Sequence, residues 1–120
     1  MKSDFRPEKK LTPEYLERLK EIVGSENVLV DPERIIDYSH DESTQSEWTR
    51  LPEAVITPTS TEAIASLMKF ASETELAITP RGGGTGLSGG CIPLRGGLVL
   101  SLEKMNRILE IDVANQMATV

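Results

Sequence analysis

The residues of this chain that are best suited to chemistry lie in one glycine-rich stretch, residues 79–90. Half of this stretch is glycine, and Arg81, Thr85 and Ser88 stand among the glycines. Glycine reaches positive φ without a Cβ clash and lets another molecule approach the main chain closely. Ordering many glycines costs conformational entropy, and a bound ligand is the natural reason to keep such a run between two apolar segments. The stretch therefore predicts a loop that wraps an anionic group with its backbone N–H groups.

Two familiar nucleotide-binding motifs can be compared with this loop, and neither agrees with its flanks. Residues 84–89 fit the pattern G-x-G-x-x-G after a predicted strand, and Glu110 follows about 20 residues later. That motif must open a helix, whereas Gly90, Pro93 and the glycines at 96–97 forbid a helix here. A Walker A loop fares worse, because no Lys-Ser or Lys-Thr pair follows the glycines. A flexible connection without a ligand is the remaining alternative.

The loop is expected to follow a β-α-β unit that spans residues 54–79. Residues 54–57 are apolar and β-branched, which predicts a strand buried on both faces. A capping-box pattern at residues 59–62 predicts a helix over 60–73. Its expected apolar stripe consists of Ile64, Leu67, Met68 and Ala71. Residues 76–79 predict a second strand, in parallel, right-handed pairing with the first.

The glycine loop thus begins at the carboxyl end of a strand, where ligands bind in open α/β sheets. After it, residues 97–101 and 108–112 predict two more strands, with a turn or short helix at 103–105. A turn at 115–116 leads into a final segment at 118–120. Because these last residues resemble a strand in progress, the chain is expected to be cut off there.

Two helices are expected before this unit. Thr12 as N-cap, proline at the first helical position and Gly24 as the stop predict an amphipathic helix over 13–23. Asp31 and the proline after it predict a short helix that ends near Tyr38. We therefore divide the chain into an N-terminal helical segment and loop, residues 1–50, and a second part, residues 51–120.

A polar, aperiodic loop is predicted at residues 39–47, and His40 within it is interpreted as surface rather than as an acid or base. The formal net charge of −6 and the scattered basic residues give no footprint for nucleic acid. With one cysteine, Cys91, and one histidine, neither a disulfide framework nor a metal site is supported. The start has no signal-peptide h-region, and no stretch approaches a membrane span, so we expect a soluble, cytoplasmic protein.

Three blocks of the sequence carry a family resemblance. They are PEAVITP at residues 52–58, PRGGGTGLSGG at 80–90 and GLVLSLEKMNRI at 97–108. In this order they closely resemble the FAD-binding domain of the vanillyl-alcohol oxidase type (PCMH-type) flavoproteins. Within that family the blocks are most similar to the glycolate oxidase flavoprotein subunit and D-lactate dehydrogenase. The resemblance covers residues 38–120 and implies an α+β fold of two subdomains with FAD between them.

The resemblance also implies which residues bind the cofactor. Residues 81–84 would wrap the FAD pyrophosphate through main-chain N–H groups, and residues 85–89 would continue toward the flavin. Relatives with covalent flavin often carry histidine where Thr85 stands, so FAD is expected to be non-covalent here. The expected cofactor-binding residues are Pro80, Arg81, Gly82, Gly83, Gly84, Thr85, Gly86, Leu87, Ser88 and Gly89.

The sequence stops after the first subdomain of that family pattern. The second FAD subdomain and the substrate domain are missing, so no catalytic residue is carried over. The expected function is the N-terminal FAD-binding portion of a 2-hydroxy acid oxidoreductase, with a partner subunit or electron acceptor in the intact protein. Alone, the chain is expected to bind FAD weakly or not at all. A stand-alone nucleotide- or anion-binding module without catalysis is the alternative.

Overall fold

The amino-terminal helix has the bounds that its capping residues predict. A computed structural model describes residues 8–43 and 48–120, and in it α1 spans Pro13–Val23. The hydroxyl of Thr12 accepts a hydrogen bond from the N–H of Tyr15 at 3.2 Å. Gly24 ends the helix at a φ of 92°, a conformation that side chains disfavour. The prediction for this helix is therefore confirmed.

The second helix is also where the sequence places it. α2 spans Pro32–Ile35 and continues as the 3₁₀ helix η2, Ile36–Tyr38. The carboxylate of Asp31 accepts the N–H of Glu33 at 3.0 Å and caps the helix. The chain then runs through an irregular segment to residue 43, as predicted. Residues 44–47 of the predicted loop lie outside the described residues.

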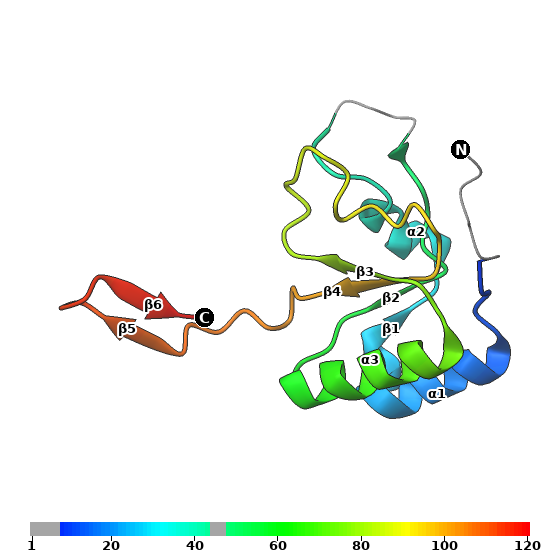
Figure 1. The fold of residues 1–120 in the computed structure, drawn as a ribbon, viewed down its shortest axis with the longest axis horizontal. Helices are drawn as coiled ribbons and strands as arrows, with labels where there is room; N and C mark the ends of the chain where they lie inside the picture. Colours follow the sequence, from blue (N-terminus) through cyan, green and yellow to red (C-terminus); the bar gives the residue numbers. More distant parts are fainter. Residues whose placement is uncertain (1–7, 44–47) are drawn as a thin grey trace.

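Four strands form one sheet, in the order β1-β2-β4-β3 (Figure 1). They are β1 (Val28–Leu29), β2 (Ala54–Ile56), β3 (Ile78–Arg81) and β4 (Leu98–Ser101). The predicted direct pairing of β2 with β3 is wrong, because both pair in parallel with β4, which lies between them. Every residue of β4 is buried, and the centre of a parallel sheet suits such a strand.

Two strand boundaries also differ from expectation. β3 begins at Ile78 rather than Leu76 and extends to Arg81, so the strand reaches the first glycine of the loop. The two-residue strand β1, which follows the 3₁₀ helix η1 (Ser25–Asn27), was not predicted. It pairs antiparallel with β2 and brings the residues before position 50 into the same sheet as those after it.

Both faces of the sheet are covered. Alternate residues along β2 and β4 point to opposite faces, and each set enters a different core. One core joins the sheet to α1 and to α3 (Thr61–Thr74), and it includes Leu19, Val23, Ala54, Ile56, Leu67, Phe70, Leu98 and Leu100. The other core lies under α2 and contains Leu29, Ile35, Val55 and Val99. Figure 1 shows α1 and α3 together on one face and α2 on the other.

The predicted helix of the β-α-β unit is present, but its apolar stripe is rotated. Its N-cap is Ser60, whose hydroxyl accepts the N–H of Ala63 at 3.2 Å, so the expected reciprocal capping box does not form. Phe70 is buried, whereas Met68 is 47% exposed. The buried stripe is therefore centred near Leu67 and includes a phenylalanine that was not in the predicted set.

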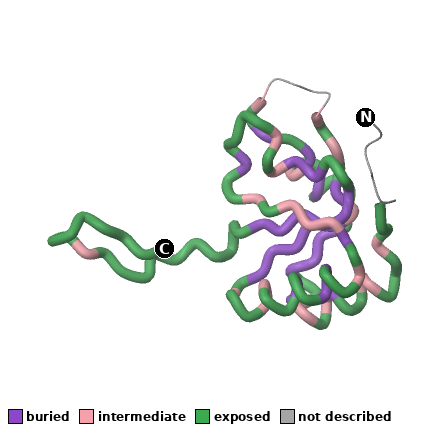
Figure 2. Tube along the Cα trace, viewed as in Figure 1, coloured by how far each residue is buried: buried purple, intermediate pink, exposed green. Residues whose placement is uncertain are grey.

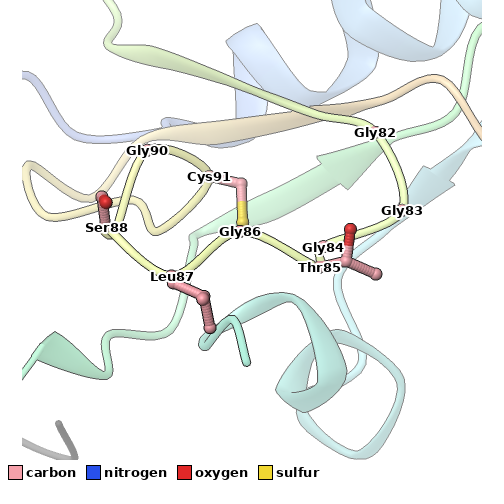
Figure 3. Close-up of a pocket in the computed structure, with 9 residues that line it drawn as sticks. All are labelled: Gly82, Gly83, Gly84, Thr85, Gly86, Leu87, Ser88, Gly90 and Cys91. Carbon is pink, nitrogen blue, oxygen red and sulfur yellow. The ribbon is translucent and has the colours of Figure 1, made fainter. Parts of the chain in front are cut away.

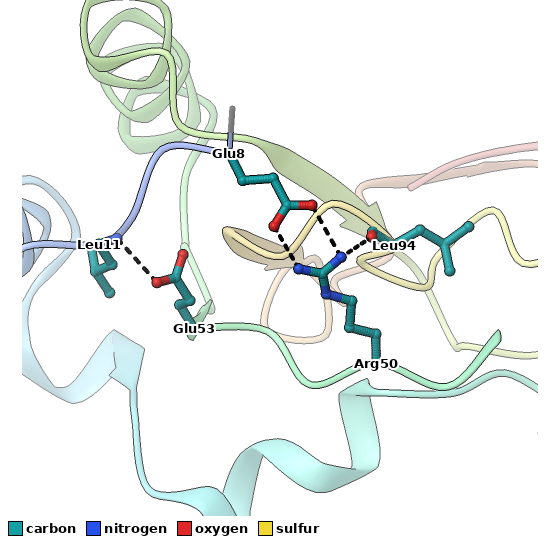
Figure 4. Close-up of polar contacts among 5 residues, drawn as sticks. All are labelled: Glu8, Leu11, Arg50, Glu53 and Leu94. Carbon is teal, nitrogen blue, oxygen red and sulfur yellow. Dashed lines mark hydrogen bonds and ion pairs between the residues drawn. The ribbon is translucent and has the colours of Figure 1, made fainter. Parts of the chain in front are cut away.

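Polar contacts join the amino-terminal residues to the segment that leads into β2 (Figure 4). Arg50 and Glu8 form an ion pair of 2.6 Å, and Arg50 also donates to the carbonyl of Leu94. The N–H of Leu11 donates to the carboxylate of Glu53 at 3.2 Å. The hydrogen bond from Arg50 lowers the pKa of Glu8. Because this pair is partly solvated, it contributes little to the stability of the fold.

The carboxyl-terminal residues form a separate hairpin that projects from the body of the molecule (Figure 1). β5 (Glu110–Asp112) pairs antiparallel with β6 (Met117–Thr119), close to the predicted strand and turn. Nearly all residues from Leu102 onward are exposed (Figure 2). Among the described residues, none of the helices is both long and apolar enough to cross a membrane.

Candidate functional site

The glycine loop leaves the sheet at the carboxyl end of β3 and runs over the face that carries α2 (Figure 1). It lines an open cavity of about 420 Å³ (Figure 3). The residues that line this cavity are Gly82, Gly83, Gly84, Thr85, Gly86, Leu87, Ser88, Gly90 and Cys91. None of these lining side chains is charged. The wall of the cavity is therefore made largely of main chain.

The main chain of this loop offers donors to a ligand. In the part of the chain that the structure describes, the N–H groups of Gly83, Gly84 and Thr85 donate to no other residue. Backbone N–H groups left without an acceptor at a concave surface favour an anion. An acidic ligand group that entered this cavity would meet these donors and no carboxylate on the lining side chains. The geometry fits a phosphate group better than a cation.

Gly84 is the one buried residue among the glycines of the cavity wall, and it needs to be glycine. Its φ is +73°, and a Cβ at this position would overlap the guanidinium of Arg81. By contrast, a Cβ at Gly82 would meet nothing within 4 Å. At this position the positive φ favours glycine, and any side chain would in addition have to displace the guanidinium of Arg81.

Arg81 is not among the residues that line the cavity, and its side chain contacts other parts of the protein. Its guanidinium donates to the carbonyl of His40 at 2.7 Å and to that of Asp37 at 3.0 Å. It also lies 3.3 Å from the sulfur of Cys91 and 5.6 Å from the ring centre of Tyr38. These contacts connect the start of the loop to the end of η2, so this arginine is engaged within the protein.

Asp41 contacts the far end of the loop. Only 6% of this residue is exposed, and its carboxylate accepts the N–H of Gly89 at 2.9 Å and the N–H of Ser43 at 2.8 Å. The next residue, Glu42, donates its N–H to the carbonyl of Gly86 at 3.1 Å. Hydrogen bonds from Ser43, and then from Gly89, lower the pKa of Asp41, which keeps it an acceptor at neutral pH.

Tyr38 extends this network to the exit of β4. Its hydroxyl donates to the carboxylate of Glu103 at 2.8 Å. Partial burial, together with this hydrogen bond, raises the pKa of Tyr38 to about 12. The phenol therefore stays protonated at physiological pH and serves as a donor.

The structure brings most of the sequence-predicted binding residues together. Those from Gly82 to Ser88 line the cavity. Pro80 and Arg81 belong to β3, and Gly89 donates its N–H to the carboxylate of Asp41. His40 is exposed and contributes its carbonyl to Arg81. Two lining residues, Gly90 and Cys91, were outside the predicted set. Asp41 was also missed, since one acid in a polar segment carries no local signal.

Fold and site together define a class. This is an α+β domain in which a glycine-rich loop presents main-chain donors at the carboxyl edge of parallel strands. Residues 52–120 match the model of the family described as FAD binding domain. The chain belongs to this family, and FAD is its cofactor.

Similar proteins agree with this assignment. The chain is 42% identical over 106 residues to a D-lactate dehydrogenase of Anaerostipes hadrus, covering 88% of this chain and 22% of that protein. It is 41% identical over 110 residues to glycolate oxidase subunit GlcD of Bacillus subtilis, covering 92% and 23%. A crystal structure of p-cresol methylhydroxylase has a TM-score of 0.72 at 25% identity, covering 88% of this chain and 22% of that one. The chain thus spans less than a quarter of the length of these relatives and has the fold of PCMH-type FAD-binding domains.

Proposed function

We propose that these residues form the N-terminal FAD-binding portion of a flavin-dependent oxidoreductase that acts on 2-hydroxy acids of the glycolate or D-lactate type. The observation that carries the proposal is the cavity of about 420 Å³ whose glycine wall contains main-chain N–H groups with no acceptor among residues 8–43 and 48–120. The names of the relatives, D-lactate dehydrogenase and glycolate oxidase subunit, favour this substrate class.

The proposal assigns the binding of phosphate to main chain. The N–H groups of Gly83, Gly84 and Thr85 would hold the pyrophosphate of FAD, with Gly82 at the entry. Residues 86–89 would continue toward the flavin ring. Thr85 has no ring nitrogen that could bond to the flavin, so the cofactor would be held without a covalent link.

The chemistry itself belongs to the cofactor: bound FAD accepts a hydride from the α-carbon of a 2-hydroxy acid. The residues of this chain would bind and orient the phosphate end, and the loop would exclude water from it. Residues that contact the substrate, and the electron acceptor or partner subunit that reoxidises the enzyme, would lie outside these 120 residues.

The test uses the product of the whole reading frame that contains this sequence. We expect a yellow protein whose flavin is released by acid precipitation, as a non-covalent cofactor must be. Under anaerobic conditions glycolate or D-lactate should bleach the flavin band, whereas propionate, which lacks the hydroxyl group, should not. A protein that retains no flavin after reconstitution with FAD would contradict the proposal. Flavin that remains with the precipitate would contradict the non-covalent assignment alone.

The second candidate is a stand-alone nucleotide- or anion-binding module. It is favoured by a cavity that is made within one chain. Calorimetric titration of the 120-residue chain with FAD, ADP and pyrophosphate separates the two. The first proposal expects weak or no FAD binding, because only one wall of the site is present. Stoichiometric binding of pyrophosphate or ADP by this chain would favour the module.

A further inference from the structure

We propose that residues 37–43 form a brace that holds the glycine loop in its binding conformation before any ligand arrives, and that Asp41 is a positioning residue of the cofactor site. The brace precedes the residues 52–120 that match the FAD-binding family. The proposal rests on the proposed function only for the identity of the ligand. The conformation of the loop can be measured without it.

The brace contacts the second half of the loop through its main chain and one carboxylate. Asp41 accepts the N–H of Gly89 at 2.9 Å, and Glu42 donates its N–H to the carbonyl of Gly86 at 3.1 Å. Asp41 is itself held by the N–H of Ser43 at 2.8 Å. The two loop residues are therefore fixed from one side, and neither bond uses an N–H group from residues 83–85.

The brace contacts the first half of the loop through Arg81. The guanidinium donates to the carbonyls of Asp37 and His40 at 3.0 and 2.7 Å, and it occupies the space that a Cβ of Gly84 would need. The loop is thus held near its start by Arg81 and near its end by Asp41. Between these two points lie the N–H groups of residues 83–85, which have no acceptor in the described part of the chain.

A physical reason for the brace follows from the composition of the loop. A free glycine-rich segment populates many conformations, and a ligand that orders it loses affinity in proportion. Bonds from a rigid neighbour remove those conformations before binding. Asp41 also carries a negative charge, and a carboxylate beside a phosphate site weakens anion binding by repulsion. The presence of Asp41 is consistent with a brace if its hydrogen bonds to the loop favour binding by more than this repulsion disfavours it.

The first test is amide hydrogen exchange of the 120-residue chain without cofactor, comparing Asp41→Ala with Glu42→Gln. Glu42 is the exposed neighbouring acid, so this control removes one carboxylate charge but leaves the brace. In the Asp41→Ala chain we expect exchange of the Gly89 and Glu42 amides, whose hydrogen bonds join the loop to the brace, to become about tenfold faster, while β2 and β4 keep their protection. Asp41→Asn, which retains one carbonyl acceptor, should give an intermediate rate. Unchanged loop exchange, or equal acceleration throughout the chain, would overturn the brace.

The second test measures the dissociation constant of FAD for the same variants of the full reading-frame product. A positioning residue predicts weaker binding in Asp41→Ala, by about tenfold, and partial recovery in Asp41→Asn. Tighter binding in both variants would mean that only the charge of Asp41 matters, and would overturn the proposal. If loop exchange responds but no variant binds FAD, the proposed function fails and the brace stands. If FAD binds and loop exchange does not respond, the brace fails alone.

Discussion

The guanidinium of Arg81 occupies the space beneath Gly84, so a side chain at residue 84 and this guanidinium exclude one another. The arginine donates to two carbonyl groups within the protein, which connects the loop to residues 37–40. An anion in the cavity has main-chain donors as its nearest partners. Affinity there should depend more on the shape of the loop than on any one side chain.

A substitution at residue 84 tests this dependence. Gly84→Val should lower the free energy of unfolding by at least about 1–3 kcal/mol, because the positive φ is strained and the guanidinium must move. Gly82→Val is the matched control, since a Cβ there meets nothing within 4 Å, and it should change stability by less than about 0.5 kcal/mol. Urea denaturation followed by circular dichroism measures both. Equal losses of stability in the two variants would show that the backbone conformation and the neighbouring guanidinium do not require glycine at residue 84.

The lowered pKa of Asp41 predicts how the stability of the chain depends on pH. Hydrogen bonds from Ser43 and Gly89 hold its pKa below the ordinary value of 3.8 in the folded state. Its contribution to stability is therefore fully present above that ordinary value and is lost as the pH falls through the lowered pKa. The difference in unfolding free energy between the wild-type chain and Asp41→Asn should be constant near pH 7 and shrink below about pH 4. A difference that persists or grows in acid would contradict this assignment.

At the scale of elements, α3 carries the crossover between two strands and its buried stripe fixes it to the sheet. Leu67 is fully buried in the core shared with α1, whereas the next residue, Met68, is 47% exposed. Neighbouring residues on one helix thus lie in opposite environments, as the period of 3.6 requires.

This contrast gives a paired test. Leu67→Ala should destabilise the domain by about 2–5 kcal/mol, because it removes buried methyl groups and leaves a cavity. Met68→Ala, on the exposed side, should cost less than about 0.5 kcal/mol, because alanine favours the helix and little burial is lost. Thermal and urea unfolding of the two variants measure the difference. A larger loss for Met68→Ala would place the stripe where the sequence first suggested.

How far the elements can be predicted depends on whether their signals are local. Thr12 and Gly24 mark the two ends of α1 because caps act within one turn. The order of the strands has no such local signal, because β2, β3 and β4 are all short, and only long-range pairing selects β4 for the centre. The two residues of β1 are too few to show a period.

The features of the candidate site also divide into those with a local sequence signal and those without one. Glycine density and flanking strands predicted the loop, since a loop that must approach a ligand needs residues without side chains. Asp41 could not be predicted, because the residue it bonds, Gly89, is 48 positions away in the sequence. The contacts of the Arg81 side chain could not be predicted either, because they depend on the carbonyl groups of Asp37 and His40, which are far away in the sequence.

At the scale of the whole molecule, the carboxyl-terminal hairpin stands apart from the core. The radius of gyration is 15.9 Å, compared with roughly 13–14 Å for a compact domain of this length. Several apolar residues of the hairpin are more than half exposed: Ile108, Leu109, Ile111, Val113, Met117 and Val120. The hairpin therefore lacks the burial that stabilises the other strands.

Hydrogen exchange should separate the two regions. An isolated two-stranded hairpin is marginal in water, so we expect the amides of β5 and β6 to exchange with little protection. The amides of β2 and β4, such as Val55 and Val99, should approach the protection set by global unfolding. Comparable protection in both regions would show that the hairpin is packed in solution.

The central position of β4 also has a consequence for synthesis on the ribosome. β2 and β3 each pair with β4 and not with one another, yet β4 is the last of the four strands to be made. A nascent chain that ends before Leu98 thus lacks the strand that joins β2 to β3. The apolar faces of its helices then have no completed sheet to pack against. The domain is expected to remain unfolded until Ser101 has left the exit tunnel and then to form its sheet in one cooperative step.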